Sequence, residues 1–372
     1  MKEQSKKVYF ITGGGTGGHI YPAISIAREL KKDINNQIYY IGNPNNLESK
    51  IATDEGFKFL PINISYMPRK LNLSFVQWAI KLQFAIWKAL FYIYKYKPNA
   101  VFGTGGYVSA PAIIAALITN TPYMMHDSDA HPGIVSRYVS QGAKIVSVAF
   151  ADAKKFIKNN NVKVFGNPIK QDFFSVSKEY AKNELSLDAA KTLLVMGGSQ
   201  GAMAINSALI NCLKPLTQDL GVNVILQTGN KNYNTTVEKI KEIYPEYENN
   251  KKIIVRSYFD NMAIPLKASD IAIARAGSLS LSELAAVEIP SILVPYPYAA
   301  ADHQRKNARC FEQAGAAIYI EDAELNANLI KETIEALIND NKKLENMKIA
   351  IKQFCKPNAT KEITQALKEI TN

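Results

Sequence analysis

Residues 8–19 read Val-Tyr-Phe-Ile-Thr-Gly-Gly-Gly-Thr-Gly-Gly-His, an apolar run that passes directly into a cluster of glycines. A second segment of the same design, Leu-Leu-Val-Met-Gly-Gly-Ser-Gln-Gly-Ala, spans residues 193–202. A helical pattern follows each segment, so each predicts a strand, a glycine loop and a helix in succession. In that arrangement backbone N–H groups and the helix dipole receive phosphate oxygens, and a Cβ would block their approach. Two such loops, one in each half of the chain, predict two phosphate-binding lobes that face one another across a cleft.

The rest of the chain alternates short β-rich runs with helical stretches, which predicts an α/β fold with parallel sheets. The length of 372 residues fits two domains of average size. We expect an N-terminal Rossmann-like domain over 1–172, a C-terminal one over 173–358, and a last helix over 359–372 that packs back on the first. The expected strands are 8–12, 37–41, 58–62, 100–102, 122–125, 144–148, 192–196, 222–227, 252–256, 271–273, 291–294 and 317–320. The expected helices are 22–32, 46–55, 74–96, 109–118, 132–140, 203–213, 234–243, 261–267, 279–287, 303–313 and 326–338.

The net charge of +11 lies entirely in the first half of the chain. Residues 1–172 hold 21 Lys and Arg against 10 Asp and Glu, whereas residues 173–372 hold 23 of each. This asymmetry predicts an acidic partner for the first half: an anionic membrane surface, a phosphorylated acceptor or nucleic acid.

The three cysteines, Cys212, Cys310 and Cys355, show no Cys-x-x-Cys spacing. We therefore expect free thiols in a reducing cytosol, with neither a disulfide framework nor a zinc site. The charged N-terminus has only a few apolar residues behind it before the glycines begin. It does not fit a secretion signal, so we expect a cytoplasmic protein.

The helical stretch 74–96 is unusually rich in large apolar and aromatic residues. Gln77, Lys81, Lys88 and Lys95 share a narrow stripe, and the remaining surface is apolar. No uninterrupted apolar run approaches the roughly 20 residues that span a bilayer. Two interpretations stay open. The stretch could be a core helix with a narrow solvent-exposed polar stripe, or part of its apolar face could meet lipid head groups, with nearby basic residues attracting anionic lipid.

His19 directly follows the first glycine loop, where its side chain suits proton transfer near neutral pH. A third glycine cluster, Gly-Thr-Gly-Gly-Tyr at 103–107, follows the expected strand 100–102. This cluster could serve the same site or could be only a tight strand-to-helix turn.

The segment His126-Asp127-Ser128-Asp129-Ala130-His131 permits two interpretations. Asp-x-Asp is a metal motif of some nucleotide-sugar enzymes, and the flanking histidines could add ligands. Four ligands within one turn rarely close around a single ion, however. An N-cap at Asp129 followed by Pro132 at the start of a helix explains the same residues more simply.

In the second half, Arg-Ala-Gly-Ser-Leu-Ser-Leu-Ser-Glu at 275–283 follows a strand and opens a helix. Its first turn offers hydroxyl and N–H groups to a diphosphate, and Glu283 could accept hydrogen bonds from ribose hydroxyls. The alternative is a capping box from Ser280 to Glu283. Further on, Asp-His-Gln-Arg-Lys-Asn-Ala at 302–308 places polar side chains where open α/β sheets bind ligands. Neither glycine loop fits a dinucleotide site well, and no P-loop is present.

Together these motifs resemble the MurG family of glycosyltransferases. The resemblance covers nearly the whole chain and rests on GGGTGGHIYPA, GTGGYVSAP, GNPI, GGSQGA, RAGSLSLSE and DHQRKNA in this order. It implies the GT-B architecture, with two Rossmann-like domains around a cleft. It also implies transfer of N-acetylglucosamine from UDP-N-acetylglucosamine to the undecaprenyl-pyrophosphate-linked MurNAc-pentapeptide, which turns lipid I into lipid II in peptidoglycan synthesis.

Carried over position by position, the resemblance places the donor mainly in the second domain. Uracil would lie near Phe259, the ribose near Glu283 and the sugar hydroxyls near Gln304. The full set of implied donor-binding residues is Thr16, Gly17, Gly18, Asp129, Lys170, Ser199, Gln200, Gly201, Phe259, Ser278, Leu279, Ser280, Leu281, Ser282, Glu283 and Gln304. The implied acceptor side comprises Gly14, Gly15, Gly105, Gly106 and Tyr107.

Two residues depart from the family pattern. Relatives commonly have asparagine where Asp129 stands and arginine where Lys170 stands. An ionised Asp129 only accepts hydrogen bonds, so an amide-type contact to the sugar must be rearranged. Lys170 keeps the positive charge but lacks the bidentate fork of arginine.

The implied reaction is a single displacement with inversion, with His19 as the base and neither metal nor cofactor. Helix-start amides would stabilise the departing UDP. The resemblance further implies a peripheral protein on the cytoplasmic face of an anionic membrane. The nearest alternative is another membrane-associated GT-B enzyme, such as a diacylglycerol glucosyltransferase. A nucleic-acid-binding protein is disfavoured, because the second half is neutral and lacks Arg/Gly repeats.

Overall fold

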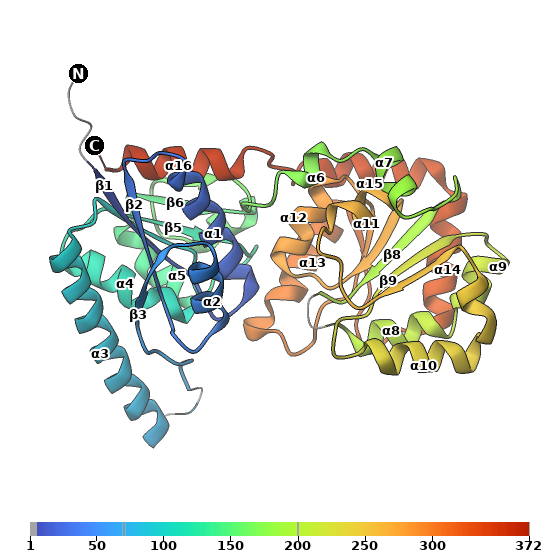
Figure 1. Ribbon diagram of the computed structural model, residues 1–372, viewed down its shortest axis with the longest axis horizontal. Helices are drawn as coiled ribbons and strands as arrows, with labels where there is room; N and C mark the ends of the chain where they lie inside the picture. Colours follow the sequence, from blue (N-terminus) through green and yellow to red (C-terminus); the bar gives the residue numbers. More distant parts are fainter. Residues whose placement is uncertain (1–5, 69, 71, 199–200, 372) are drawn as a thin grey trace. The chain divides into compact units, whose positions relative to one another are not determined.

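The computed structural model describes residues 6–68, 70, 72–198 and 201–371. The chain forms two compact units, Met1–Ile169 with Asn358–Asn372, and Lys170–Pro357. Each unit holds one sheet in which every pair of neighbouring strands is parallel. The predicted α/β fold is therefore confirmed (Figure 1).

Unit 1 contains a seven-stranded sheet in the order β3-β2-β1-β4-β5-β6-β7. Its strands are β1 (Lys7–Thr12), β2 (Asn36–Gly42), β3 (Lys58–Pro61), β4 (Ala100–Gly103), β5 (Tyr123–Asp127), β6 (Ile145–Val148) and β7 (Val162–Val164). Its α-helices are α1 (Gly17–Lys31), α2 (Leu47–Asp54), α3 (Leu73–Tyr96), α4 (Gly106–Ile118), α5 (Ile134–Val139) and α16 (Ala359–Glu369). Two 3-10 helices complete it, η1 (Ser140–Gly142) and η2 (Ala151–Phe156).

Alternate residues of β1 enter two hydrophobic cores, one on each face of the unit 1 sheet. Phe10 joins the core that contains residues of α3 and α4. Tyr9 and Ile11 join the other core, together with residues of α1 and with Ile363 and Leu367 of α16. The last helix of the chain thus forms part of the core of unit 1, beside α1 (Figure 1).

Unit 2 contains a six-stranded sheet in the order β10-β9-β8-β11-β12-β13. Its strands are β8 (Thr192–Met196), β9 (Asn223–Gln227), β10 (Ile253–Arg256), β11 (Ile271–Ala274), β12 (Ser291–Leu293) and β13 (Ala317–Tyr319). Its α-helices are α6 (Asp172–Ser175), α7 (Lys178–Glu184), α8 (Met203–Ile210), α9 (Leu213–Gln218), α10 (Tyr233–Ile243), α11 (Ala263–Ala268), α12 (Ser278–Ala286), α13 (His303–Gln313), α14 (Ala327–Asn339) and α15 (Asn341–Lys352). Its 3-10 helices are η3 (Pro245–Asn249) and η4 (Ala300–Asp302).

The expected strands agree with the structure to within two residues at each end, but strand β7 and helices α6, α7, α9 and α15 went unpredicted. Strand β7 is three residues long with a central exposed lysine, so it carries little apolar signal. Helices α6 and α7 occupy the polar stretch around the predicted domain boundary. Helix α1 begins at Gly17 rather than near residue 22, because Pro22 lies inside the helix instead of starting it.

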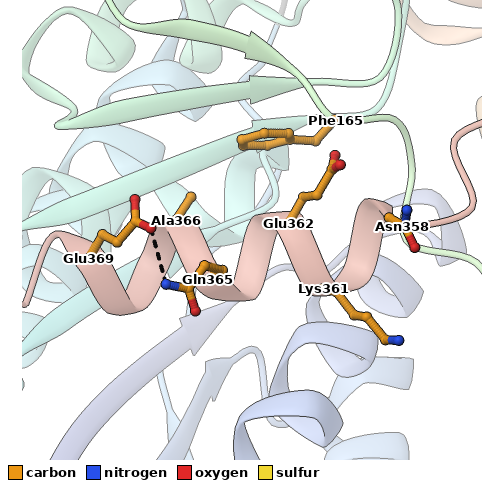
Figure 2. A pocket seen from close by; sticks show the side chains of 7 residues that line it. All are labelled: Phe165, Asn358, Lys361, Glu362, Gln365, Ala366 and Glu369. Carbon is orange, nitrogen blue, oxygen red and sulfur yellow. Dashed lines mark hydrogen bonds between the residues drawn. The ribbon is translucent and has the colours of Figure 1, made fainter.

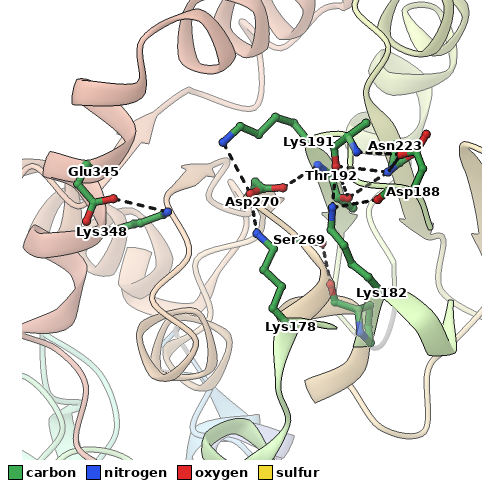
Figure 3. Close-up of polar contacts among 12 residues, drawn as sticks. Lys178, Lys182, Asp188, Lys191, Thr192, Asn223, Ser269, Asp270, Glu345 and Lys348 are labelled. Carbon is green, nitrogen blue, oxygen red and sulfur yellow. Dashed lines mark hydrogen bonds and ion pairs between the residues drawn. The ribbon is translucent and has the colours of Figure 1, made fainter. Parts of the chain in front are cut away.

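The polar stretch 178–191 is attached to unit 2 by a buried carboxylate (Figure 3). Asp270 accepts hydrogen bonds from Lys178 Nζ at 2.6 Å and from the backbone N–H of Thr192 at 2.9 Å. Burial alone would raise the pKa of Asp270, but these two contacts outweigh it and hold the pKa below its ordinary value. This pairing explains why α7 packs with α11 and lies within unit 2.

Helix α3 fits the core-helix interpretation over only part of its length. Its buried residues are Ala85, Ala89, Tyr92 and Ile93, all in its second half. Figure 1 shows the helix extending past the edge of the sheet. The core-helix interpretation therefore holds only for the C-terminal half of α3. In the described part of the chain, no helix is long and apolar enough to cross a membrane.

Candidate active site

The first glycine loop lies where the strand order of unit 1 reverses, between β1 and β4. Ligands of open α/β sheets bind at this switch point. The Tyr40 hydroxyl donates a hydrogen bond to the Gly13 carbonyl at 2.6 Å and so holds the loop in place. Gly15 has a φ of +84°, and a Cβ at Gly14 would lie 2.5 Å from Glu48 Oε1. The loop therefore needs glycine for its backbone conformation at one position and for space at the other.

Glu48 holds this loop, and sequence reasoning missed it. The residue is fully buried in the first turn of α2. Its carboxylate accepts hydrogen bonds from Gly15 N at 3.3 Å, Asn43 N at 3.2 Å and Asn46 Nδ2 at 3.3 Å. An acidic residue opening the helix after the second strand was the available signal. The Glu48 carboxylate therefore holds the glycine loop in place through the Gly15 N–H.

His19 is held by two hydrogen bonds to Thr104, the residue that follows β4. Its Nδ1 lies 2.9 Å from the Thr104 carbonyl, and Thr104 Oγ1 donates to the His19 carbonyl at 2.6 Å. A carbonyl oxygen only accepts, so Nδ1 carries the proton of the neutral ring. The Nε2 atom of His19 is therefore left as an acceptor, which is the form that a general base requires.

The third glycine cluster lies against the first. This position fits the interpretation that both clusters serve one site. A Cβ at Gly106 would lie 2.9 Å from His19 Cδ2, so the imidazole rests directly on this backbone. The Tyr107 hydroxyl accepts from Asn46 Nδ2 at 3.0 Å, and its ring packs on that of Tyr66 with centroids 3.9 Å apart. Gly105, Gly106 and Tyr107 therefore belong to the same site as His19.

The segment 126–131 does not form a metal site in the described structure. His126 is fully buried with both ring nitrogens engaged, by Ser147 Oγ at 2.9 Å and Asn167 Oδ1 at 3.0 Å. Burial lowers the pKa of His126 to about 4, so it stays neutral. Among the described residues, no group of three or more His, Cys, Asp or Glu is placed to hold an ion.

The alternative interpretation of this segment, an N-cap at Asp129, is also wrong. Helix α5 begins at Ile134 with Gly133 in the N-cap position. Asp127 instead accepts a hydrogen bond from the backbone N–H of Asp129 at 3.1 Å and orders the turn. Burial, together with the neighbouring Asp129, raises the pKa of Asp127.

The Gly-Asn-Pro motif at 166–168 is tied to the start of α1. Asn167 Nδ2 donates to the Ser128 carbonyl at 3.3 Å, and Ser128 Oγ donates to the Gly18 carbonyl at 3.2 Å. The Gly18 carbonyl is available because Pro22, four residues on, has no N–H to offer it. Thr16, Gly17 and Gly18 are thus fixed at the mouth of the unit 1 site.

The second glycine loop lies at the corresponding point of unit 2, between β8 and β11. Its central residues, Ser199 and Gln200, lie outside the described residues. Gly201 has a φ of +77°, and a Cβ there would lie 2.1 Å from the Thr228 carbonyl. The loop is therefore packed closely against the end of β9, and only glycine fits at this position.

Helix α12 begins at Ser278 with Gly277 as its N-cap residue, so the capping-box interpretation of Ser280 and Glu283 is wrong. The backbone N–H groups of Leu279 and Ser280 stand in the first turn of this helix, where the helix dipole favours an anion. The Leu281 side chain is fully buried and its N–H donates to the Gly277 carbonyl at 3.0 Å, so it offers neither group to a ligand. Ser282 Oγ donates to the Ser278 carbonyl at 3.0 Å.

Glu283 is an acid of unit 2 whose pKa is raised. Burial raises the pKa of its carboxyl to about 7, and the positive charge of Lys170 acts in the opposite direction. Lys170 and Glu283 thus interact within one unit, although they are more than a hundred positions apart in sequence. Carboxyl groups with such pKa values cluster at functional sites.

Two further predicted residues surround the same end of the unit 2 sheet. Phe259 follows β10, and its N–H donates to Gln227 Oε1 at 3.1 Å, which anchors this segment to the end of β9. Gln304 stands in the first turn of α13, where its Oε1 accepts from the backbone N–H of Tyr296 at 3.0 Å. Its Nε2 group is therefore the one directed away from that contact.

A shallow groove elsewhere on unit 1 carries none of the predicted site residues. It runs along α16 and is lined by Phe165, Asn358, Lys361, Glu362, Gln365, Ala366 and Glu369 (Figure 2). Its charged residues stand on an exposed helix face, and the candidate site is the one built from the glycine loops.

Comparison with protein families matches the chain in two parts. Residues 9–148 match the glycosyltransferase family 28 N-terminal domain, and residues 192–363 match the glycosyltransferase family 28 C-terminal domain. The two matches divide the chain in the same order as its two sheets.

Curated relatives match over nearly the full length. One from Caldanaerobacter subterraneus is 38% identical over 98% of this chain and 100% of its own, and one from Halothermothrix orenii is 37% identical over 93% and 94%. Both are named UDP-N-acetylglucosamine--N-acetylmuramyl-(pentapeptide) pyrophosphoryl-undecaprenol N-acetylglucosamine transferase.

Solved structures agree on the fold. The crystal structure of Acinetobacter baumannii MurG matches with a TM-score of 0.79 and 26% identity, covering 98% of this chain and 99% of that one. A UDP-GlcNAc 2-epimerase from Neisseria meningitidis matches with a TM-score of 0.67 at 14% identity, over 98% and 100%. The epimerase likeness shows the shared fold alone.

Proposed function

The chain belongs to glycosyltransferase family 28, and we propose on this premise that it transfers N-acetylglucosamine from UDP-N-acetylglucosamine to the undecaprenyl-pyrophosphate-linked MurNAc-pentapeptide. The product is lipid II, the precursor of peptidoglycan. The observation that carries this proposal is the identity of 37–38% to transferases of that name over nearly the whole chain. The same relatives favour this reaction over glucosyl transfer to diacylglycerol.

We assign the acceptor and the base to unit 1. The acceptor pyrophosphate meets the loop that contains Gly14 and Gly15, which Glu48 and Tyr40 hold in place. His19 Nε2 removes the proton of the MurNAc 4-hydroxyl as that oxygen attacks the anomeric carbon. The Thr104 carbonyl fixes the ring tautomer and stabilises the imidazolium that forms.

We assign the donor to unit 2. The diphosphate lies at the start of α12, where the first-turn amides and the helix dipole stabilise the charge on departing UDP. Glu283 accepts hydrogen bonds from the ribose hydroxyls, with Lys170 close enough to influence its charge. Gln304 contacts the sugar through Nε2, because Oε1 is held by Tyr296. The segment of Phe259 borders the uracil, and no metal ion takes part in the reaction we propose.

A transfer assay with two donor and acceptor pairs tests the reaction. Purified protein is given labelled UDP-N-acetylglucosamine with a lipid I analogue, or UDP-glucose with diacylglycerol. We expect label to move only in the first pair, with no consumption of UDP-N-acetylglucosamine when the acceptor is left out. Glucosyl transfer to diacylglycerol, or conversion of the donor alone, would contradict the proposal.

We further propose that α3 holds the enzyme peripherally on an anionic, cytoplasmic membrane surface. Seven large apolar residues of α3 are more than half exposed: Leu73, Val76, Ile80, Phe84, Trp87, Phe91 and Tyr94. At about 100° per residue they fall within an arc of about 80°. Lys81, Lys88 and Lys95 flank this stripe on one side. An apolar stripe with basic residues at its border suits insertion at the lipid head groups.

Replacing Phe84 and Trp87 together by glutamate should weaken binding to vesicles that contain anionic lipid by at least tenfold, since burying each ring is worth roughly 2 kcal/mol. Sedimentation with such vesicles measures the effect. The matched control is Ile349→Glu, which changes an equally exposed apolar residue on α15 of unit 2. Equal vesicle binding by the double variant and the control would contradict the assignment of α3.

A further inference from the structure

The backbone just before α13 adopts an unusual conformation. Ala301 has φ 51° and ψ 23°, and Asp302 has φ 58° and ψ 29°. Both residues are in the left-handed region, and neither is glycine. Two consecutive L-residues in this region are strained, because each Cβ approaches a neighbouring carbonyl oxygen. Such an elbow, Ala301–Asp302, persists only where surrounding contacts hold it.

Arg305 holds the Asp302 side of this elbow, and Lys306 Nζ donates to the Ala301 carbonyl at 3.1 Å. Its Nη1 group donates to both carboxylate oxygens of Asp302, each at 3.0 Å. Its Nε and Nη2 groups donate to the two carboxylate oxygens of Glu321, at 3.1 and 3.2 Å. One guanidinium therefore joins the elbow to the segment that follows β13. The planar fork of arginine is needed for this geometry, which lysine does not reproduce.

The elbow determines where Gln304 stands. Asp302 N donates to the Ala299 carbonyl at 3.1 Å, and Ala299 N donates to the Tyr296 carbonyl at 3.2 Å. Tyr296 N in turn donates to Gln304 Oε1. These bonds close a ring from Tyr296 through the elbow to the first turn of α13. If the elbow relaxes, the Tyr296 contact is lost and the Gln304 amide is free to rotate.

We propose that Arg305 is a positioning residue for the donor sugar: it holds the strained Ala301–Asp302 elbow so that Gln304 presents its Nε2 group to a sugar hydroxyl. This inference rests on the proposed function, since it takes the donor sugar to lie at Gln304. On this inference, the Asp302–Arg305–Glu321 contact determines how much more tightly the protein binds the UDP-sugar than UDP. Arg305 itself need not touch the ligand.

Calorimetric titration of Arg305→Met with UDP and with UDP-N-acetylglucosamine tests the inference. Methionine keeps the apolar stem and removes the fork. We expect Kd for UDP-N-acetylglucosamine to rise about fivefold or more, the value of a neutral hydrogen bond, while Kd for UDP stays within about twofold. Adding Ala301→Gly should restore at least half of the lost affinity, because glycine adopts positive φ without strain.

The matched control is Arg309→Met, one turn further along α13. Arg309 packs on the ring of Tyr319 and pairs with Glu312, without contacting the elbow. It should bind both ligands as the unaltered chain does. Equal weakening of UDP and UDP-N-acetylglucosamine by Arg305→Met, no weakening of either, or no rescue by Ala301→Gly would each overturn the inference. Failure of the unaltered chain to bind UDP-N-acetylglucosamine would instead overturn the proposed function.

Discussion

Replacing His19 by alanine is expected to lower kcat roughly 10²- to 10⁴-fold, the usual contribution of a positioned general base. The binding of UDP-N-acetylglucosamine should change by no more than about twofold, because the proposal assigns the diphosphate, the ribose and the uracil to unit 2. The fall in kcat is expected because the contact between His19 Nδ1 and the Thr104 carbonyl leaves Nε2 as the acceptor for a proton. Steady-state transfer kinetics and calorimetric titration of the donor measure the two quantities.

His19→Gln sharpens this test. The glutamine amide can donate to the Thr104 carbonyl and so keep the packing on Gly106, but it cannot take up a proton. It should be nearly as slow as the alanine variant. His131→Ala is the matched control, because His131 packs on Phe156 outside the assigned machinery. A glutamine variant with near-normal turnover would reduce His19 to a structural residue.

Replacing Glu283 by glutamine should weaken the binding of UDP-N-acetylglucosamine and of UDP alike, by roughly 10- to 100-fold, the range for a hydrogen bond to a charged group. Both ligands are affected because both carry the ribose. Calorimetry with each ligand measures the loss. Glu288→Gln, at the end of the same helix, is the control: that carboxylate pairs with Lys352 and is expected to leave nucleotide binding unchanged. If UDP binds Glu283→Gln normally, the ribose assignment fails.

The raised pKa of Glu283 also predicts how donor affinity changes with pH. Burial raises the pKa of Glu283 to about 7 in the free protein, and the ribose hydroxyls need the carboxylate form. Below pH 7 the site must release a proton before it binds, so donor affinity should rise with pH up to about 7 and level off above it. The Glu283→Gln variant should show no such rise. A flat profile in the unaltered chain would contradict the assignment.

Linkage also predicts an effect of Glu283 on stability. A carboxyl whose folded pKa lies above its unfolded value favours the folded state most at low pH, and this advantage is lost as pH rises from about 4.5 to about 7. Glu283→Gln should therefore be more stable than the unaltered chain at pH 8, by at most about 3 kcal/mol. Thermal unfolding at pH 5 and pH 8 measures this difference. On this account, Glu283 serves nucleotide binding and lowers the stability of the folded chain above pH 7.

The elements most predictable from sequence were those with a strong local pattern. The two glycine loops and the buried strands before them are contiguous in the chain, so an apolar run ending in glycines was enough to locate β1 and β8. Likewise the sequence placed Glu283 a turn into a helix that follows β11, as the structure has it. Local pattern also explains the errors there: Ser280 and Glu283 have capping-box spacing, yet the helix begins two residues before Ser280.

Contacts between distant segments could not be read in this way. Thr104 and Glu48 are, respectively, 85 and 33 positions from the loop residues they hold, and no spacing rule joins them. The same limit applies to α3, whose composition fits a core helix. Only the fold reveals that the buried residues of α3 all lie in its second half, and that Phe84, Trp87, Phe91 and Tyr94 stay exposed. The Arg305 contact to Asp302 depends on a backbone conformation that no side-chain pattern encodes.

The central claim is that amides at helix beginnings in unit 2, with no divalent cation, hold the nucleotide diphosphate. A backbone amide chemical-shift map of the chain with UDP-N-acetylglucosamine in excess chelator tests it most directly. The account predicts binding under these conditions, with the largest shifts at Gly277–Ser280 and further shifts near Phe259 and Gln304. Shifts confined to the Gly13–Gly18 loop, or binding that returns only when a divalent ion is added, would contradict it.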